Sequence, residues 1–248
     1  MRRIWYRLRA PFDDYIAALE ACSRDRRTLW LVAPAAVLSW WIYVPLHELL
    51  HAYGCLWTGG EVTRLEIDAV YGAGFLQRYF PFVAVGSEYA GQLTGFETHG
   101  SDWIYLATDA LPFVLTILIG VPLLRRAATS PPLPAALALG VALPIAFAPF
   151  LSLTGDYFEM GSILASRALF FVDPATDVTR WRSDDLFKLI GERLEPGPLD
   201  VIVVASSVLI ALLLAWLTYG AGAFVSNRLT RRSVTTDPPS PDLAETAG

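Results

Sequence analysis

The 248-residue sequence contains little cysteine and little charge. Its two cysteines, Cys22 and Cys55, are far apart, which excludes a disulfide framework and a cysteine-rich metal cluster. Charged residues make up only 17% of the chain and the net charge is −5, so nucleic acid is not an expected partner. We find no phosphate-binding glycine loop and no serine or cysteine triad, and the N-terminal segment is not expected to be a removable signal peptide.

Apolar residues are abundant instead, at 54% of the chain with a mean hydropathy of +0.43. Four apolar stretches are long enough to cross about 30 Å of hydrocarbon at about 1.5 Å per residue. They are Leu29 to Tyr53, Trp103 to Leu124, Leu133 to Leu153 and Leu199 to Val225. The sequence therefore predicts an all-α integral membrane bundle of about four transmembrane helices. A shorter apolar stretch, 162–172, is a continuation of the third helix or an interfacial helix.

The segment between the first two spans has a different composition. Residues 58–102 are rich in glycine, aromatic and β-branched residues, which predicts a small β-rich or re-entrant segment. Such a segment either presents an extended substrate at a strand edge or serves as a linker with aromatic membrane anchors. The expected organisation is a basic, partly helical N-terminal arm (1–28), a three-span core (29–164), an extracytoplasmic loop (165–198), a fourth transmembrane helix (199–225) and a disordered tail (226–248).

The distribution of basic residues predicts the orientation. Alternating spans place the N-terminal arm, the loop at 125–132 and the tail on one side, with 12 of the 19 Lys and Arg residues. The opposite side carries 7 Lys and Arg against 14 Asp and Glu. The positive-inside rule then makes both termini cytoplasmic, as in an integral multi-pass protein of the cell (inner) membrane. The outer ends of the first and third spans are thereby expected at a similar depth.

The first span contains the sequence HELLH, in which His47, Glu48 and His51 form H-E-x-x-H. Residues at i and i+4 lie on one helix face, so both imidazoles can bind one Zn²⁺ while Glu48 reaches a metal-bound water. Zinc lowers the pKa of that water to about 7, and Glu48 acts as the catalytic base. A charge inside a span costs about 2.5 to 3.5 kcal/mol on insertion scales, and a bound metal is a simple partner for it.

A catalytic zinc site needs a third protein ligand. Asp156 is the first choice, because Pro149 and Gly155 are expected to break the third helix and aim this carboxylate inward. Glu159 is the alternative third ligand. Asp109, inside the second span, is expected to orient a zinc-bound histidine, to relay a proton, or to hydrogen-bond to a nearby hydroxyl. His99 is expected to be an ordinary loop histidine.

These features resemble the site-2 protease family of intramembrane zinc metalloproteases over roughly Leu29 to Leu164. His47 and His51 match the paired histidine ligands of that family, and Glu48 matches its catalytic glutamate. The family's third ligand is an aspartate in an Asp-Gly motif on the third core span. The sequence GDYFEMGSIL offers Asp156 or Glu159 for this role, without the preceding Asn of the family motif.

The sequence thus predicts a membrane-embedded zinc metalloprotease that hydrolyses peptide bonds of membrane-protein substrates. A related hydrolase with lipidated or soluble peptide substrates is a second interpretation. A third is a non-enzymatic membrane protein, such as an ion or proton carrier or an assembly factor, that uses the same His, Glu and Asp residues. In each case the lipid bilayer is a partner.

Overall fold

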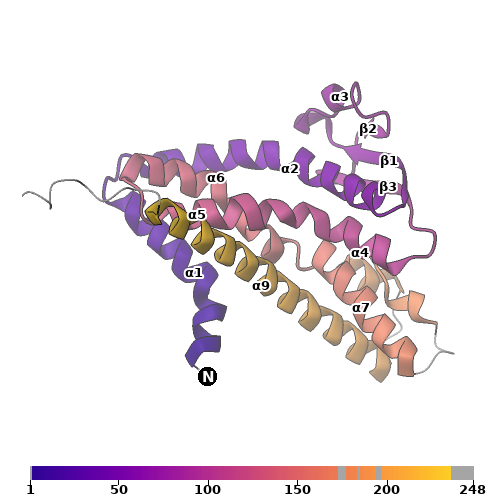
Figure 1. The fold of residues 1–248 in the computed structure, drawn as a ribbon. Helices are drawn as coiled ribbons and strands as arrows, with labels where there is room; N and C mark the ends of the chain where they lie inside the picture. Colours follow the sequence, from indigo (N-terminus) through magenta and orange to yellow (C-terminus); the bar gives the residue numbers. More distant parts are fainter. Residues whose placement is uncertain (1, 173–176, 184, 194–196, 236–248) are drawn as a thin grey trace, which may run out of the picture.

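The computed structural model describes residues 2–172, 177–183, 185–193 and 197–235. Long helices run side by side, and a small sheet lies at one end of the bundle (Figure 1). The helices are α1 (Arg2–Ser23), α2 (Val32–Trp57), α3 (Ala73–Leu76), α4 (Asp102–Ala110), α5 (Val121–Ala127), α6 (Pro132–Leu151), α7 (Asp156–Val172), α8 (Leu186–Lys188) and α9 (Pro198–Thr235). The strands are β1 (Glu61–Ile67), β2 (Val83–Val85) and β3 (Gly91–Glu97).

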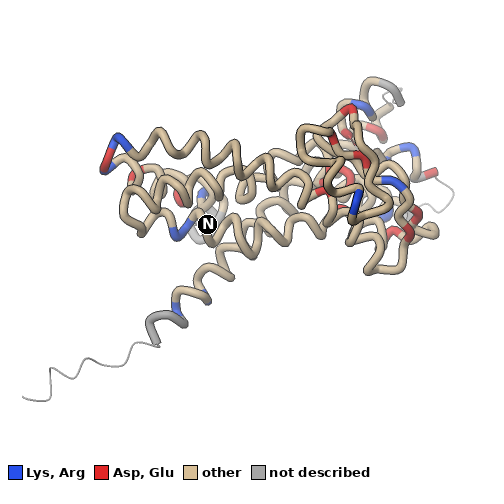
Figure 2. Tube along the Cα trace, turned by 90° about the horizontal axis from the view of Figure 1, so that it is seen from above, with Lys and Arg blue, Asp and Glu red and all other residues tan. Residues whose placement is uncertain are grey.

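Four helical stretches of this bundle are long and apolar enough to cross a membrane. They are Leu29–Trp57, Asp102–Ala127, Pro132–Leu169 and Pro198–Arg231. Figure 2 shows the charged residues gathered mostly at the two ends of the bundle, with a largely uncharged length between them. An apolar band flanked by charge is the pattern that a bilayer requires. The predicted helical membrane bundle with a small sheet is confirmed.

The boundaries after the third span differ from those expected. The apolar stretch 162–172 is helical, as expected, so the first residues of the loop expected at 165–198 belong to α7, which continues to Val172. Ala165 of α7 packs in a buried cluster with Trp181 and Val203, so this part of the chain gains apolar contacts by remaining helical. The described residues of the segment from 177 to 193, namely 177–183 and 185–193, form only short helical turns.

The expected disordered tail is wrong for residues 226–235, which continue α9. Arg125 of α5 donates hydrogen bonds to the Ala223 carbonyl and to Asn227, which fixes this end of α9 against the bundle. The rest of the expected tail, 236–248, lies outside the described residues.

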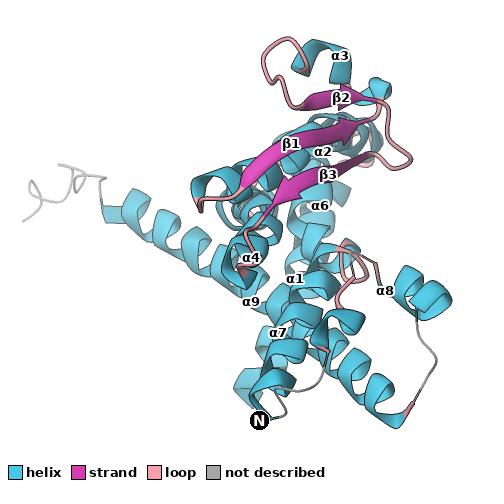
Figure 3. Ribbon diagram, turned by 90° about the vertical axis from the view of Figure 1, so that its right-hand side faces the viewer, coloured by secondary structure: helices cyan, strands magenta, loops and turns pink. Residues whose placement is uncertain are grey.

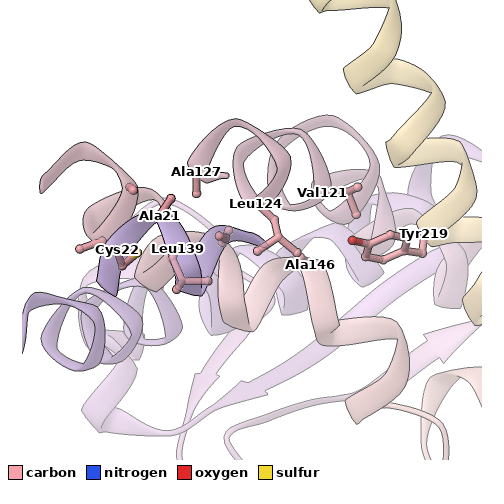
Figure 4. Packing of buried hydrophobic residues seen from close by; sticks show 12 residues of the cluster. Ala21, Cys22, Val121, Leu124, Ala127, Leu139, Ala146 and Tyr219 are labelled. Carbon is pink, nitrogen blue, oxygen red and sulfur yellow. The ribbon is translucent and has the colours of Figure 1, made fainter. Parts of the chain in front are cut away.

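Helix α1 is an integral part of the bundle rather than a separate arm. Its fully buried Ala18, Ala21 and Cys22 pack in one cluster with residues of α5, α6 and α9 (Figure 4). Asp14 of α1 pairs with Arg125 and accepts a hydrogen bond from Tyr219 at 2.9 Å. Burial raises the pKa of Asp14, although the charge of Arg125 opposes this shift.

The segment after α2 forms a three-stranded sheet in the order β2-β1-β3, which confirms its predicted β-rich character. Strand β1 pairs in parallel with β2 and antiparallel with β3, so Leu65 lies opposite both Val83 and Leu93. Buried Leu65 and Val83 pack in one cluster with Leu49 and Ala52 of α2. The sheet therefore lies on the C-terminal half of α2, the half that carries the H-E-x-x-H sequence (Figure 3).

The third span is interrupted, as predicted, but a few residues beyond Pro149. This proline is inside α6, which ends at Leu151, and α7 begins at Asp156. Because proline at 149 has no N–H, the carbonyl of Ile145 lacks its helical donor and instead accepts a 2.7 Å hydrogen bond from Thr116. The break at 152–155 places the first turn of α7 beside the middle of α2.

Candidate metal centre

The two histidines of the H-E-x-x-H sequence converge on one point. His47 and His51 lie on the same face of α2, and their Nε2 atoms are 3.1 Å apart. Their rings pack edge to face at 4.7 Å between centroids. His51 is buried, with 7% of its surface exposed, and Phe113 covers the His47 ring on another side. Two imidazole nitrogens thus face each other in an environment poor in water.

The Nδ1 atom of His51 is held by the backbone of α4. It lies 2.9 Å from the carbonyl oxygen of Thr108. A carbonyl only accepts hydrogen bonds, so Nδ1 carries the proton and the Nε2 lone pair of the neutral ring is free for a ligand bond. The Thr108 carbonyl is available because Pro112, four residues later, has no N–H to complete the helical hydrogen bond.

A tyrosine holds the other imidazole. The hydroxyl of Tyr43, one helical turn before His47, lies 2.8 Å from His47 Nδ1. Tyr43 is 5% exposed and belongs to a buried cluster that includes Phe113 and Tyr157. Partners of this kind on the outer ring nitrogen orient metal-binding histidines and fix their tautomer.

Asp156 supplies a carboxylate to the same point from the first turn of α7. Its Oδ2 atom is 3.3 Å from His47 Nε2, and its Oδ1 atom is 3.7 Å from His51 Nε2. Ser152, in the break between α6 and α7, donates a 2.7 Å hydrogen bond to Oδ2. The start of a helix favours a negative charge, so the helix break and the carboxylate suit each other.

His47, His51 and Asp156 can hold a metal ion, since their ligand atoms all lie within 4.8 Å of one another. Tetrahedral ligands at about 2.0–2.1 Å from zinc are about 3.3 Å apart. The 3.1 Å between the two Nε2 atoms and the 3.3 Å from His47 Nε2 to Asp156 Oδ2 are close to that value, whereas the 3.7 Å from His51 Nε2 is to the other carboxylate oxygen, Oδ1. Two imidazoles and one carboxylate can bind a divalent metal ion, and three protein ligands leave a position open for water.

Glu48 lies beside this group at the junction of two cavities. A polar cavity of about 590 Å³ is lined by Glu48, His51 and Asp156 together with β3 and α4. A smaller cavity of about 230 Å³ is lined by Glu48, His47 and Asp156 together with apolar residues of α2 and α6. Gly91, at the start of β3, lies against the Glu48 side chain so closely that a Cβ atom at this position would overlap it. Glycine at 91 therefore lets the strand pass directly over the glutamate.

The other residues singled out in the sequence lie around this group. Glu159, the alternative third ligand, accepts a hydrogen bond from Tyr105 and is not among the three grouped ligands. Asp109 is buried and lines the polar cavity. His99 lies in a loop 4.0 Å from Glu61, away from the metal group. Cys55 points its sulfur towards the backbone carbonyls at the ends of β1 and β3.

Sequence reasoning missed three residues that hold the ligands, Tyr43, Thr108 and Ser152, and it missed Gly91, which lies against Glu48. Two of them had a detectable signal: Tyr43 is one helical turn before His47, and Thr108 is four residues before a proline. The contact of Gly91 depends on how the sheet folds back over α2, for which the sequence has no local signal.

Comparisons with protein-family models, with curated proteins and with solved structures found no match for this chain. The functional argument therefore depends on the geometry of the site.

Proposed function

We propose that this chain is a membrane-embedded zinc metalloprotease that hydrolyses peptide bonds of membrane-protein substrates. The observation that carries the proposal is the convergence of His47, His51 and Asp156 on one point, with the Glu48 side chain beside them in a cavity lined by polar side chains. The position of the three ligand residues within apolar helices supports substrates that are themselves in the membrane.

His47, His51 and Asp156 would hold the zinc ion. When bound, zinc supplies Lewis acidity, which makes water easier to deprotonate and polarises the carbonyl of the substrate. Glu48 accepts the proton of the attacking water and returns it to the departing amine, which is the work of a general base and then a general acid. Thr108 and Tyr43 keep the imidazoles in their ligand orientation throughout.

Strand β3 is suited to hold the substrate. It lies at the edge of the sheet and lines the polar cavity with Gly91, Gln92, Leu93, Thr94 and Phe96. An extended peptide that pairs with a sheet edge is held by its backbone, whatever its side chains. Because Gly91 lies over Glu48, a peptide on this edge would pass the catalytic group.

The proposal is tested with zinc-reconstituted protein in nanodiscs and a set of quenched fluorescent peptides derived from transmembrane segments. We expect about one zinc per chain, since the three ligands form one site, and cleavage that Glu48→Gln lowers by about 10²–10⁴-fold without loss of zinc. Glu20→Gln, an exposed carboxamide change on α1, is the control and leaves both unchanged.

Two results would contradict the proposal. One is a wild-type protein that holds no zinc after reconstitution. The other is a Glu48→Gln variant that cleaves peptides at the wild-type rate. A zinc-loaded protein that cleaves no peptide, but in which Glu48→Gln alters ion or proton flux across proteoliposomes, would favour the carrier function instead.

A further inference from the structure

The polar cavity next to the metal group has an excess of negative charge. Five carboxylates line it: Glu48, Asp109, Asp156, Glu159 and Asp185. The guanidinium in its wall, Arg182, is bound in a bidentate pair by Asp102 at 2.6 and 3.0 Å. Even with a divalent ion on the metal group, the carboxylates outnumber the positive charges around the cavity. A cleft of one sign concentrates ligands of the opposite sign.

One of these carboxylates has an oxygen without a partner. Asp109 of α4 is only 3% exposed, and among the described residues nothing forms a hydrogen bond with its Oδ2 atom. The hydroxyl of Tyr105, one helical turn earlier, donates to Glu159 instead. A buried carboxylate oxygen inside an apolar helix is costly unless a cation or a donor reaches it.

The missing partner is better explained by an organic cation than by a second metal ion. Within the described residues, the one group of three metal-ligand side chains is His47, His51 and Asp156, so Asp109 and Glu159 lack a third ligand for an ion of their own. An ammonium group instead carries three donors and needs only nearby acceptors. Both carboxylates lie in the same cavity as β3, along which the substrate is expected to extend.

We propose that Asp109 and Glu159 bind a cationic group of the substrate, either a basic side chain or a free α-amino group, beside the bond to be cleaved. This proposal rests on the proposed protease function and adds to it a preference for cationic substrates. Its tests measure the binding of a cation separately from the cleavage of peptides, so the two proposals can fail separately.

The first test measures the charge of the cavity without any substrate. Thr94 of β3 is exposed and lines the cavity, whereas the native Cys22 and Cys55 are fully buried. The measured quantity is the rate at which a cysteine reacts with a trimethylammonium methanethiosulfonate, divided by its rate with the anionic sulfonate analogue. In zinc-loaded protein this ratio should be about tenfold or more higher for Thr94→Cys than for the control Thr63→Cys, which is on β1 outside the cavity. Adding Asp109→Asn should reduce this preference several-fold, whereas adding Glu20→Gln should not.

The second test identifies the source of the cation. Apolar peptides that differ only in a lysine or a norleucine, each with a free or an acetylated N-terminus, protect Thr94→Cys from N-ethylmaleimide. Lysine peptides that protect at lower concentration than norleucine peptides indicate a basic side chain. Stronger protection by peptides with a free N-terminus than by acetylated peptides indicates the α-amino group. In both cases Asp109→Asn, in the background Glu48→Gln, should remove the advantage.

Equal protection by cationic and neutral peptides, or a charge preference that Asp109→Asn does not change, would overturn the proposal. Cleavage of neutral and cationic peptides at equal rates would leave the proposed protease in place and remove the cation site. Tight binding of lysine peptides that are never cleaved would support the cation site and contradict the proposed protease.

Discussion

The hydrogen bond between His47 Nδ1 and the Tyr43 hydroxyl gives a sharp test of the metal centre, because a His47 that binds metal through Nε2 carries its proton on Nδ1 and donates it to the tyrosine oxygen. Tyr43→Phe removes only the hydroxyl that lies 2.8 Å from His47 Nδ1. Because Tyr43 is 5% exposed, little water can replace that hydroxyl, and an unpaired buried donor costs about 1–3 kcal/mol. This cost corresponds to a zinc affinity that is about 5- to 150-fold weaker, in the range of about 10- to 100-fold seen for partners of metal-binding histidines.

Tyr157→Phe is the matched control. Tyr157 belongs to the same buried cluster as Tyr43, is 1% exposed and forms one hydroxyl hydrogen bond of 2.7 Å, but with Thr218 of α9. Zinc competition against a chromogenic chelator, in detergent-purified protein, measures both variants. Tyr157→Phe should stay within about threefold of the wild type, since its hydroxyl does not touch a ligand. Equal zinc affinities for the two variants would refute the assignment of His47 as a ligand oriented by Tyr43.

Three further predictions concern the surroundings of the site. A Cβ at Gly54 would lie 2.5 Å from the carbonyl oxygen of Ala107, so Gly54→Val should separate α2 from α4, lower the thermal midpoint and weaken zinc binding. In the control Gly220→Ala, the added Cβ meets nothing within 4 Å, so the thermal midpoint and the zinc affinity should not change. Pro112→Ala restores an N–H that competes for the Thr108 carbonyl, so zinc affinity should fall while helicity, measured by circular dichroism, does not. Burial raises the pKa of Asp14 above its value in the unfolded chain, so the contribution of Asp14 to stability is present at low pH and is lost as pH rises. The thermal midpoint of the wild type minus that of Asp14→Asn should therefore be larger at about pH 4 than at about pH 7. A difference that stays constant with pH would contradict the raised pKa.

The sequence was sufficient for the features that depend on local spacing. The i, i+4 relation of His47 and His51 fixes their common face, and the lengths of the apolar stretches predict the four long helices. The choice of Asp156 followed from one further step, that alternating spans bring residues from two distant segments to the same depth. The contact of Asp156 with His47 and His51 is therefore a long-range contact that the order of the spans could suggest.

What the sequence could not provide depends on the termination of helices and on tertiary contacts. Residues 226–235 were expected in a disordered tail, yet they continue α9 to Thr235, and Arg125 binds this helix at Ala223 and Asn227. Similarly, Pro149 and Gly155 were expected to break the third helix, and the break at 152–155 lies just after the proline; α6 continues past Pro149 to Leu151, and the Ile145 carbonyl freed by the proline accepts a hydrogen bond from Thr116. Side chains from distant segments decide both outcomes.

The two cavities around Glu48 would let one site serve both reactants of the proposed hydrolysis. The polar cavity, with its carboxylates and its strand edge, reaches the metal group from the His51 side and can hold water. The smaller cavity reaches it from the His47 side and shares Trp40 and Leu151 with an apolar groove between α2 and α6. Glu48 and Asp156 line both cavities, so they form the boundary between a wet and an apolar environment. A peptide bond of a membrane segment and a water molecule meet most easily at such a boundary, because neither then has to cross the environment of the other.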